Sequence, residues 1–304
     1  YCKIKKDYFI AMLFPVIGDK TSYINSLLEA SGDVFFKKDI FLNRNGLHNL
    51  VLQMYRDQNW TSIEENSGYS KTLEHSFNRY EKNKPVSILF IENTSLSKLK
   101  EVKLKIREYL KKGNYPIHIP DNIEESTRIA EQVLNENSIN FLNTSRPKNN
   151  KNFVYFLKKF NQYINESTNS KDSYCISGSS VMSAYGLRDT RDLDVIAIKK
   201  LYFNDKDIHL HNKEVEKYLG PCEEIVKNPE NHFYYNGIKF MTIDLVYKFK
   251  NKRNEHKDKI DTAIISSIIN KKSLVNKIYN KAKGFFYTIF GYLINFMKRK
   301  TPKI

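Results

Sequence analysis

The stretch that decides the fold begins with Ser177-Gly178-Ser179-Ser180 and ends, after a spacer, with Asp192-Leu193-Asp194-Val195. On a strand, side chains at i and i+2 point to the same face, so the two carboxylates project together. Two like charges held that close need a compensating cation, and oxygen ligands select a hard divalent ion such as Mg²⁺ or Mn²⁺. A Gly-Ser turn ahead of a short helix attracts an anion through its backbone N–H groups. Together these features predict phosphoryl or nucleotidyl transfer.

Length and composition bound the remaining possibilities. The chain has 304 residues, 40% of them hydrophobic, which predicts two domains with well-formed cores. Cys2, Cys175 and Cys222 are odd in number and lack metal-ligand spacing, which favours a reducing cytoplasm over a disulfide framework or a zinc site. The short apolar run 8–17 is interpreted as a first strand and not as a signal peptide, and no stretch approaches the roughly 20 apolar residues of a membrane span.

Strand and helix signals alternate through the first half. The periodicity and the capping residues predict these elements: strands 8–15, 34–42, 86–91 and 115–119, and helices 21–30, 47–55, 70–80, 96–110 and 123–134. The polar segment from Thr144 to Lys151 is the best candidate for a linker. We therefore place a first domain at 1–143, a linker at 144–152 and a second domain from 153 onward.

The first half resembles nucleoside diphosphate kinase over 8–142. The resemblance rests on a first strand ending in Phe14-Pro15, on the Met54-Tyr55-Arg56-Asp57 stretch, and above all on Ile117-His118-Ile119-Pro120-Asp121. It implies a ferredoxin-like domain in which His118 carries a phosphate that Arg107 contacts. The lysine expected before the proline is replaced by Phe14, and Ile119-Pro120 stands where the family has Gly-Ser. The favoured alternative is that His118 is a strand-end histidine making a local hydrogen bond.

The second half contains a hairpin with an unusual charge. A helix over 153–164 leads into a strand at 174–177, a helix at 181–185 and a strand at 193–198. Asn236-Gly237 marks a two-residue turn between strands 232–235 and 238–247. On the second hairpin strand, Asp244 shares a face with Phe240, Thr242 and Val246. A carboxylate in such an apolar strand is costly to bury unless it binds a metal or a partner.

These features resemble the polymerase-β-like nucleotidyltransferase superfamily over 151–270. The pattern is Gly-Ser, a spacer, the Asp-x-Asp pair and a later strand carboxylate; the segment Lys252-Arg253 to Asp261 is similar to the helix after the core. The resemblance implies a mixed-sheet catalytic domain at 153–270 that works by a two-metal mechanism.

The resemblance also implies a role for each candidate residue. Asp192 and Asp194 would hold the metals on the donor phosphates, and Asp244 the metal that activates an acceptor hydroxyl. The expected nucleotide and phosphate contacts are Gly178, Ser179, Ser180, Arg188, Arg191 and, more weakly, Lys257. Solvated arginines and a lysine that lies along its helix are the alternatives.

The last residues, 271–304, form a basic tail. The net charge of the chain is +16, and no Asp or Glu follows Asp261, whereas nine Lys or Arg residues do. The stretch 274–297 predicts an amphipathic helix with a large aromatic face and a cationic rim, typical of a helix at an anionic membrane surface through 274–300. The alternative is a helix that packs on the catalytic domain. Nucleic acid is a less favoured partner, because the aromatics form a continuous apolar run.

The sequence therefore predicts an α+β enzyme that uses Mg²⁺ or Mn²⁺ and a nucleotide or nucleotide-activated donor. The first hypothesis is nucleotidyl or phosphoryl transfer to an acceptor hydroxyl. The second is a membrane-associated transferase for surface glycans, similar to choline-phosphate and fukutin-type transferases, and the third is a nucleotide-binding regulatory protein without catalysis. The expected location is the cytoplasm. If the basic tail binds the membrane, the protein is expected at the inner membrane face as a peripheral protein.

Overall fold

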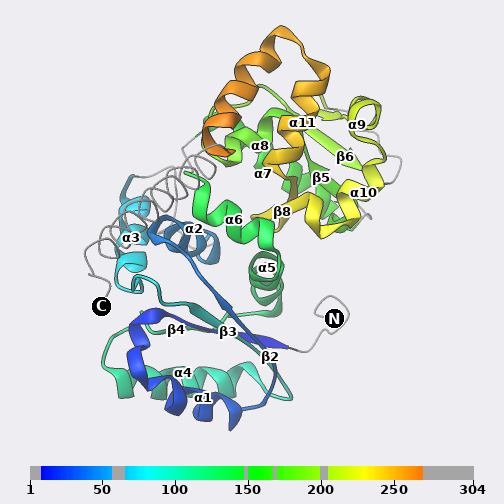
Figure 1. The fold of residues 1–304 in the computed structure, drawn as a ribbon. Helices are drawn as coiled ribbons and strands as arrows, with labels where there is room; N and C mark the ends of the chain where they lie inside the picture. Colours follow the sequence, from blue (N-terminus) through cyan, green and yellow to red (C-terminus); the bar gives the residue numbers. More distant parts are fainter. Residues whose placement is uncertain (1–7, 57–65, 147–149, 167–169, 199–204, 270–304) are drawn as a thin grey trace, which may run out of the picture. The chain divides into compact units, whose positions relative to one another are not determined.

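The structure is a computed structural model that describes residues 8–56, 66–146, 150–166, 170–198 and 205–269. Its fold is α+β with two sheets, as the sequence predicts (Figure 1). Contacts along the chain divide it into a unit comprising 1–249 and a unit from 250 onward. The predicted tail helix lies outside the described residues. No helix within the described ranges is both long and apolar enough to cross a membrane.

The first sheet lies in the first half of the chain and is antiparallel throughout. Its order is β2-β3-β1-β4. The strands are β1 (Phe9–Leu13), β2 (Asp33–Ile40), β3 (Val86–Glu92) and β4 (Ile117–His118). The alternation in β1 sends Ile10 and Met12 into one cluster of buried residues and Ala11 and Leu13 into another, so both faces of the sheet are covered.

Helices cover each face of this sheet. Figure 1 shows α1 (Thr21–Glu29) and α4 (Leu96–Leu110) together on one side, where both contribute to the same buried cluster. The opposite cluster takes α2 (Arg44–Met54), α5 (Ile123–Leu134) and α6 (Glu136–Thr144). The remaining elements of this half are α3 (Asn66–Phe77) and the 3-10 helix η1 (Pro15–Lys20).

The second sheet is mixed and has the order β7-β6-β5-β9-β8. The β5/β9 and β6/β7 pairs are parallel, and the β5/β6 and β8/β9 pairs are antiparallel. Its strands are β5 (Tyr174–Ile176), β6 (Leu193–Ala197), β7 (Ile208–Leu210), β8 (His232–Tyr235) and β9 (Ile238–Met241). The connecting helices are α7 (Lys151–Glu166), η3 (Lys171–Ser173), α8 (Gly178–Ala184), α9 (Asn212–Leu219), α10 (Cys222–Lys227) and η4 (Pro229–Asn231).

The outer edge of β8 is covered by α6. Phe141 stacks on Phe233 with ring centroids 4.4 Å apart. The amide of Tyr234 donates to Ser138 Oγ at 2.8 Å, and Asn135 Nδ2 donates to the His232 carbonyl at 3.2 Å. The Tyr234 amide and the His232 carbonyl on this edge of β8 therefore have hydrogen-bond partners within the fold.

The predicted strand 238–247 is wrong in its second half. The strand β9 ends at Met241, and α11 (Ile243–Arg253) follows directly. Thr242 starts the helix, since its Oγ1 accepts from the Leu245 amide at 3.4 Å. Ile243, Val246 and Phe249 are buried at spacings of three, which is the period of a helix face. A further helix covers 256–269.

Candidate functional site

Gly178 lies in the turn between β5 and α8 and allows Asp194 to approach the backbone. Its φ is +63°, a left-handed conformation that strains any residue with a side chain. A Cβ added at this position would lie 2.2 Å from Asp194 Oδ2. The neighbouring Ser177 amide donates to the Asp194 carbonyl at 2.8 Å. Glycine is therefore needed at 178 for the Asp194 carboxylate to lie where it does.

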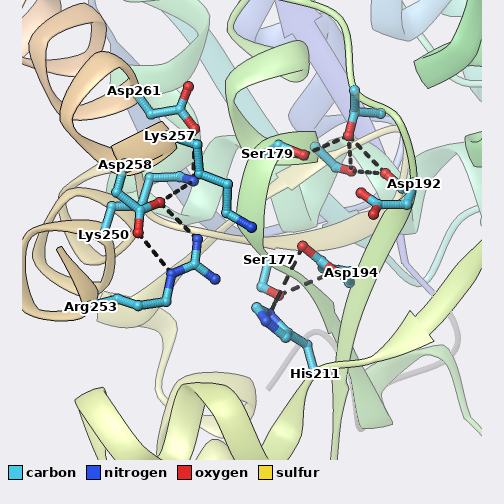
Figure 2. Close-up of polar contacts among 12 residues, drawn as sticks. Ser177, Ser179, Asp192, Asp194, His211, Lys250, Arg253, Lys257, Asp258 and Asp261 are labelled. Carbon is cyan, nitrogen blue, oxygen red and sulfur yellow. Dashed lines mark hydrogen bonds and ion pairs between the residues drawn. The ribbon is translucent and has the colours of Figure 1, made fainter. Parts of the chain in front are cut away.

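Asp192 and Asp194 form the centre of the site. Asp192 immediately precedes β6, Asp194 lies within it, and both side chains are half-buried. One ligand atom from each, together with one from His209, lies within 4.8 Å of the other two. The juxtaposition of the two carboxylates that the sequence predicts is present, and Figure 2 shows it beside Ser177 and Ser179.

His209 reaches this pair from β7. The parallel register of β6 and β7 sets Asp194 opposite His209. The ring Nε2 of His209 lies 2.8 Å from the Lys206 carbonyl oxygen. Because a carbonyl can only accept, Nε2 carries the proton, and the lone pair of the neutral ring is on Nδ1.

His211 is a second histidine beside the Asp194 carboxylate. Its Nδ1 is 4.0 Å from Asp194 Oδ2 and 3.4 Å from Ser177 Oγ (Figure 2). Its amide donates to the Val195 carbonyl at 2.8 Å, which continues the pairing beyond β7. Sequence reasoning missed both histidines. The signal was available, because His209-Leu210-His211 repeats the i, i+2 spacing of the aspartates.

Hydroxyl groups fix the chain just ahead of β6. Thr190 Oγ1 donates to the Asp192 carbonyl at 2.7 Å and lies 2.6 Å from Ser179 Oγ. The fully buried Ser180 donates to the same carbonyl at 3.1 Å. Ser179 and Ser180, which the sequence assigns to phosphate binding, thus use their hydroxyls to position Asp192.

The predicted arginines occupy different surroundings. Arg188 is half-buried and donates from Nη1 to the Asp189 carbonyl at 3.0 Å, whereas Arg191 is exposed next to Asp192. Asp189 itself caps α7 by accepting from the amides of Asn152 and Phe153 at 3.2 and 3.1 Å. The loop before Asp192 is therefore held to α7 through Asp189 and to α8 through Thr190.

Asp244 lies on α11, directly after strand β9. It is an exposed residue in the first turn of α11, and among the described residues the metal-binding group contains His209 and not Asp244. Burial raises the pKa of Tyr185, and the charge of Asp244 adds to that shift. Tyr185 follows the last residue of α8, on the order of 10 Å from the Gly178 end. The predicted strand position of Asp244 is wrong because the helix begins one residue before it.

Lys257 belongs to the second unit, where it is exposed and pairs with Glu255 at 3.1 Å. Beneath it lies a buried charged cluster, which we call the Asp258 cluster: Lys250, Arg253, Asp258 and Asp261 (Figure 2). Arg253 donates to Asp258 at 2.8 and 2.7 Å, and Lys250 lies 2.8 Å from Asp261. Burial alone would raise the pKa of Asp258, but Arg253 and Lys250 lower it to about 2. The two positive charges of the cluster offset its two negative charges. We therefore infer that these residues stabilise the fold of the second unit.

His118 is buried at the end of β4. Its Nε2 lies 2.9 Å from Glu125 Oε1, and its Nδ1 lies 3.4 Å from the hydroxyl of Tyr55. Burial lowers the pKa of His118, and the bond to Glu125 opposes that shift only in part. The nearby Arg107 donates to the Ile117 carbonyl at 3.4 Å. This geometry fits the favoured alternative, a strand-end histidine with a local hydrogen bond.

Comparison with protein-family models, with curated proteins and with solved structures finds no match to this chain.

Proposed function

We propose that the protein is a divalent-metal-dependent transferase that moves a nucleotidyl or phosphoryl group from a nucleotide donor to an acceptor hydroxyl. The observation that carries the proposal is the pair Asp192 and Asp194, set against the Gly178 turn at the start of α8. A carboxylate pair next to a turn whose backbone N–H groups start a helix combines an ion site with hydrogen-bond donors for a phosphate.

The strand orders support this proposal. Read from its other edge, the first sheet is β4-β1-β3-β2 and fully antiparallel, which is the arrangement of a ferredoxin-like domain. In the second sheet Asp194 lies on β6 and Asp192 just before it, next to the strand that ends in the glycine turn. We assign this second half a nucleotidyltransferase-like fold.

The chemistry can be divided among the residues. Asp192 and Asp194 would hold the ion, which when bound neutralises donor phosphates and lowers the pKa of an attacking hydroxyl. Gly178 lets the Asp194 carboxylate lie against the backbone, and Thr190 holds the chain at Asp192 by donating to its backbone carbonyl. The exposed Arg191 offers a guanidinium to the donor phosphates.

Labelled nucleoside triphosphates test the proposal directly. The full chain is incubated with Mg²⁺ or Mn²⁺, with donors labelled at the α- or the γ-phosphate, and with small-molecule, glycan and RNA acceptors. Transfer of the α label identifies nucleotidyl transfer, and transfer of the γ label identifies phosphoryl transfer. We expect Asp192→Asn and Asp194→Asn to reduce transfer by about 100-fold or more, and the exposed Asp19→Asn to retain it. Equal activity in Asp194→Asn and the wild-type protein would contradict the proposal.

A further inference from the structure

We propose that His209 is the third ligand of the ion site, which makes the site selective for a divalent transition ion such as Mn²⁺ over Mg²⁺. This inference rests on the proposed function for the role of Asp192 and Asp194, and it adds a nitrogen ligand from a different strand. A nitrogen ligand favours first-row transition ions, of which Mn²⁺ is the weakest binder, whereas Mg²⁺ is usually held by oxygen atoms alone.

The distances allow one ion to be shared. The ligand atoms of Asp192, Asp194 and His209 lie within 4.8 Å of one another. Two ligands at about 2.1 Å from the same ion are at most about 4.2 Å apart, so small side-chain rotations close the site. All three residues lie on or beside two adjacent strands, and the register Asp194 opposite His209 holds them on one face.

The hydrogen bonding of the histidine is that of a metal ligand. Its Nε2–H donates to the Lys206 carbonyl at 2.8 Å, which fixes the tautomer and aims the lone pair of Nδ1 away from that carbonyl. A backbone carbonyl on the far nitrogen is a common outer partner of metal-bound histidine, because it orients the ring and raises its basicity.

The Asp194 carboxylate is held in place before any ion arrives. Gly178 bounds it on one side, with no room even for a methyl group, and the His211 ring is 4.0 Å away on another. The neighbouring Asp192 is fixed through its carbonyl by Thr190 and Ser180. The Asp194 carboxylate and the backbone at Asp192 are therefore held in place, and the exposed His209 is the ligand that closes the set.

Binding of Mn²⁺ alone tests the inference without any substrate. The full chain is titrated with Mn²⁺, the unbound ion is followed by electron paramagnetic resonance, and Mg²⁺ is added as competitor. The wild-type protein should show nitrogen hyperfine coupling from one imidazole. His209→Ala should lose that coupling and weaken Mn²⁺ binding by about tenfold or more. The exposed His256→Ala should behave as the wild-type protein does.

A conservative variant sharpens the result. His209→Asp replaces the nitrogen with an oxygen ligand, and we expect it to bind a divalent ion again while losing the preference for Mn²⁺ over Mg²⁺. Circular dichroism checks that each variant is folded. Unchanged Mn²⁺ affinity and unchanged nitrogen coupling in His209→Ala would overturn the inference. That result would not contradict the proposed transfer reaction. Conversely, Mn²⁺ bound through His209 with no transfer of any label would leave this inference standing and remove the proposed function.

Discussion

Gly178 and Asp194 are in such close contact that a single methyl group on the glycine would lie 2.2 Å from the carboxylate oxygen. The two residues come from different elements, α8 and β6, and the backbone bond from Ser177 to the Asp194 carbonyl holds them together. The Asp194 carboxylate, a candidate metal ligand, can therefore occupy its position only because Gly178 has no side chain.

Replacing this glycine should cost more than replacing an equivalent one elsewhere. Gly178→Ala adds a collision with Asp194 to the strain of a left-handed backbone, and we expect a loss of about 3 kcal/mol in the free energy of unfolding. Gly113→Ala is the matched control, since Gly113 also has a positive φ, of +58°, but open space around it. It should cost about 1 kcal/mol. Urea denaturation measures both, and equal losses would show that Asp194 is not confined by Gly178.

Asp244→Asn should leave ion binding and transfer close to wild-type levels. Asp244 is exposed in the first turn of α11, and among the described residues it is not in the group of three that could hold an ion. Mn²⁺ titration of Asp244→Asn beside Asp194→Asn measures the difference. A loss as large as that of Asp194→Asn would restore the three-carboxylate centre that the sequence predicts.

The Asp258 cluster should stabilise the second unit in an acid-sensitive way. The pKa of Asp258 is lowered to about 2, so its contribution is full above the ordinary carboxyl pKa and is lost as the pH falls from about 4 to about 2. Asp258→Asn should cost about 3 kcal/mol, because Arg253 loses the carboxylate to which it donates two hydrogen bonds in a largely buried cluster. Hydrogen exchange in the helix 256–269 measures the loss. Lys257→Gln removes only an exposed pair and should cost less than about 1 kcal/mol; similar losses in both variants would contradict the assignment.

Mild acid should weaken the first half through His48. Burial lowers the pKa of His48 to about 4, while its ring contacts the Thr72 hydroxyl at 3.1 Å. The unfolded chain therefore takes up this proton first, and stability should fall by up to about 3 kcal/mol as the pH drops from about 6.5 to about 4. Urea unfolding as a function of pH gives the slope. His48→Gln should flatten it, and an unchanged slope would remove His48 as the cause.

His118 should be needed for stability and not for transfer. His118→Gln disturbs the buried bond to Glu125, and we expect a loss of about 1–3 kcal/mol in unfolding free energy. After incubation with a γ-labelled nucleotide, no acid-labile phosphate should be found on His118. Phosphate bound there, and lost in His118→Gln, would establish a second reaction centre of the kind that the sequence resemblance implies.

Local signals were sufficient for many elements of the fold. The helices α4 and α5 begin and end at the predicted residues, and the starts are fixed by Ser95 and Asn122, whose side chains cap the first turns. The stretch after Met241 was harder, since Phe240, Thr242 and Val246 also fit an alternating strand. Only the helical spacing of Ile243, Val246 and Phe249 distinguishes the two, and a short stretch shows both periods.

Only part of the candidate site was predictable from the sequence, because one of its residues comes from a distant strand. The proximity of Asp192 and Asp194 is local, and so is the glycine turn before them. His209 joins them through a parallel pairing of β7 with β6, which depends on how the chain crosses over between strands. Spacing along the sequence does not reveal such a pairing, particularly for a strand of three residues.

Among the strands that the structure describes, β7 is the last of the second sheet and β6 is its only neighbour. An ion held by Asp194 and His209 would therefore act as a cross-link between the last two strands, tying a short edge to the body of the sheet. Ion binding and the pairing of β7 with β6 would then be coupled. Binding of the ion would stabilise the pairing, and separation of β7 from β6 would release the ion.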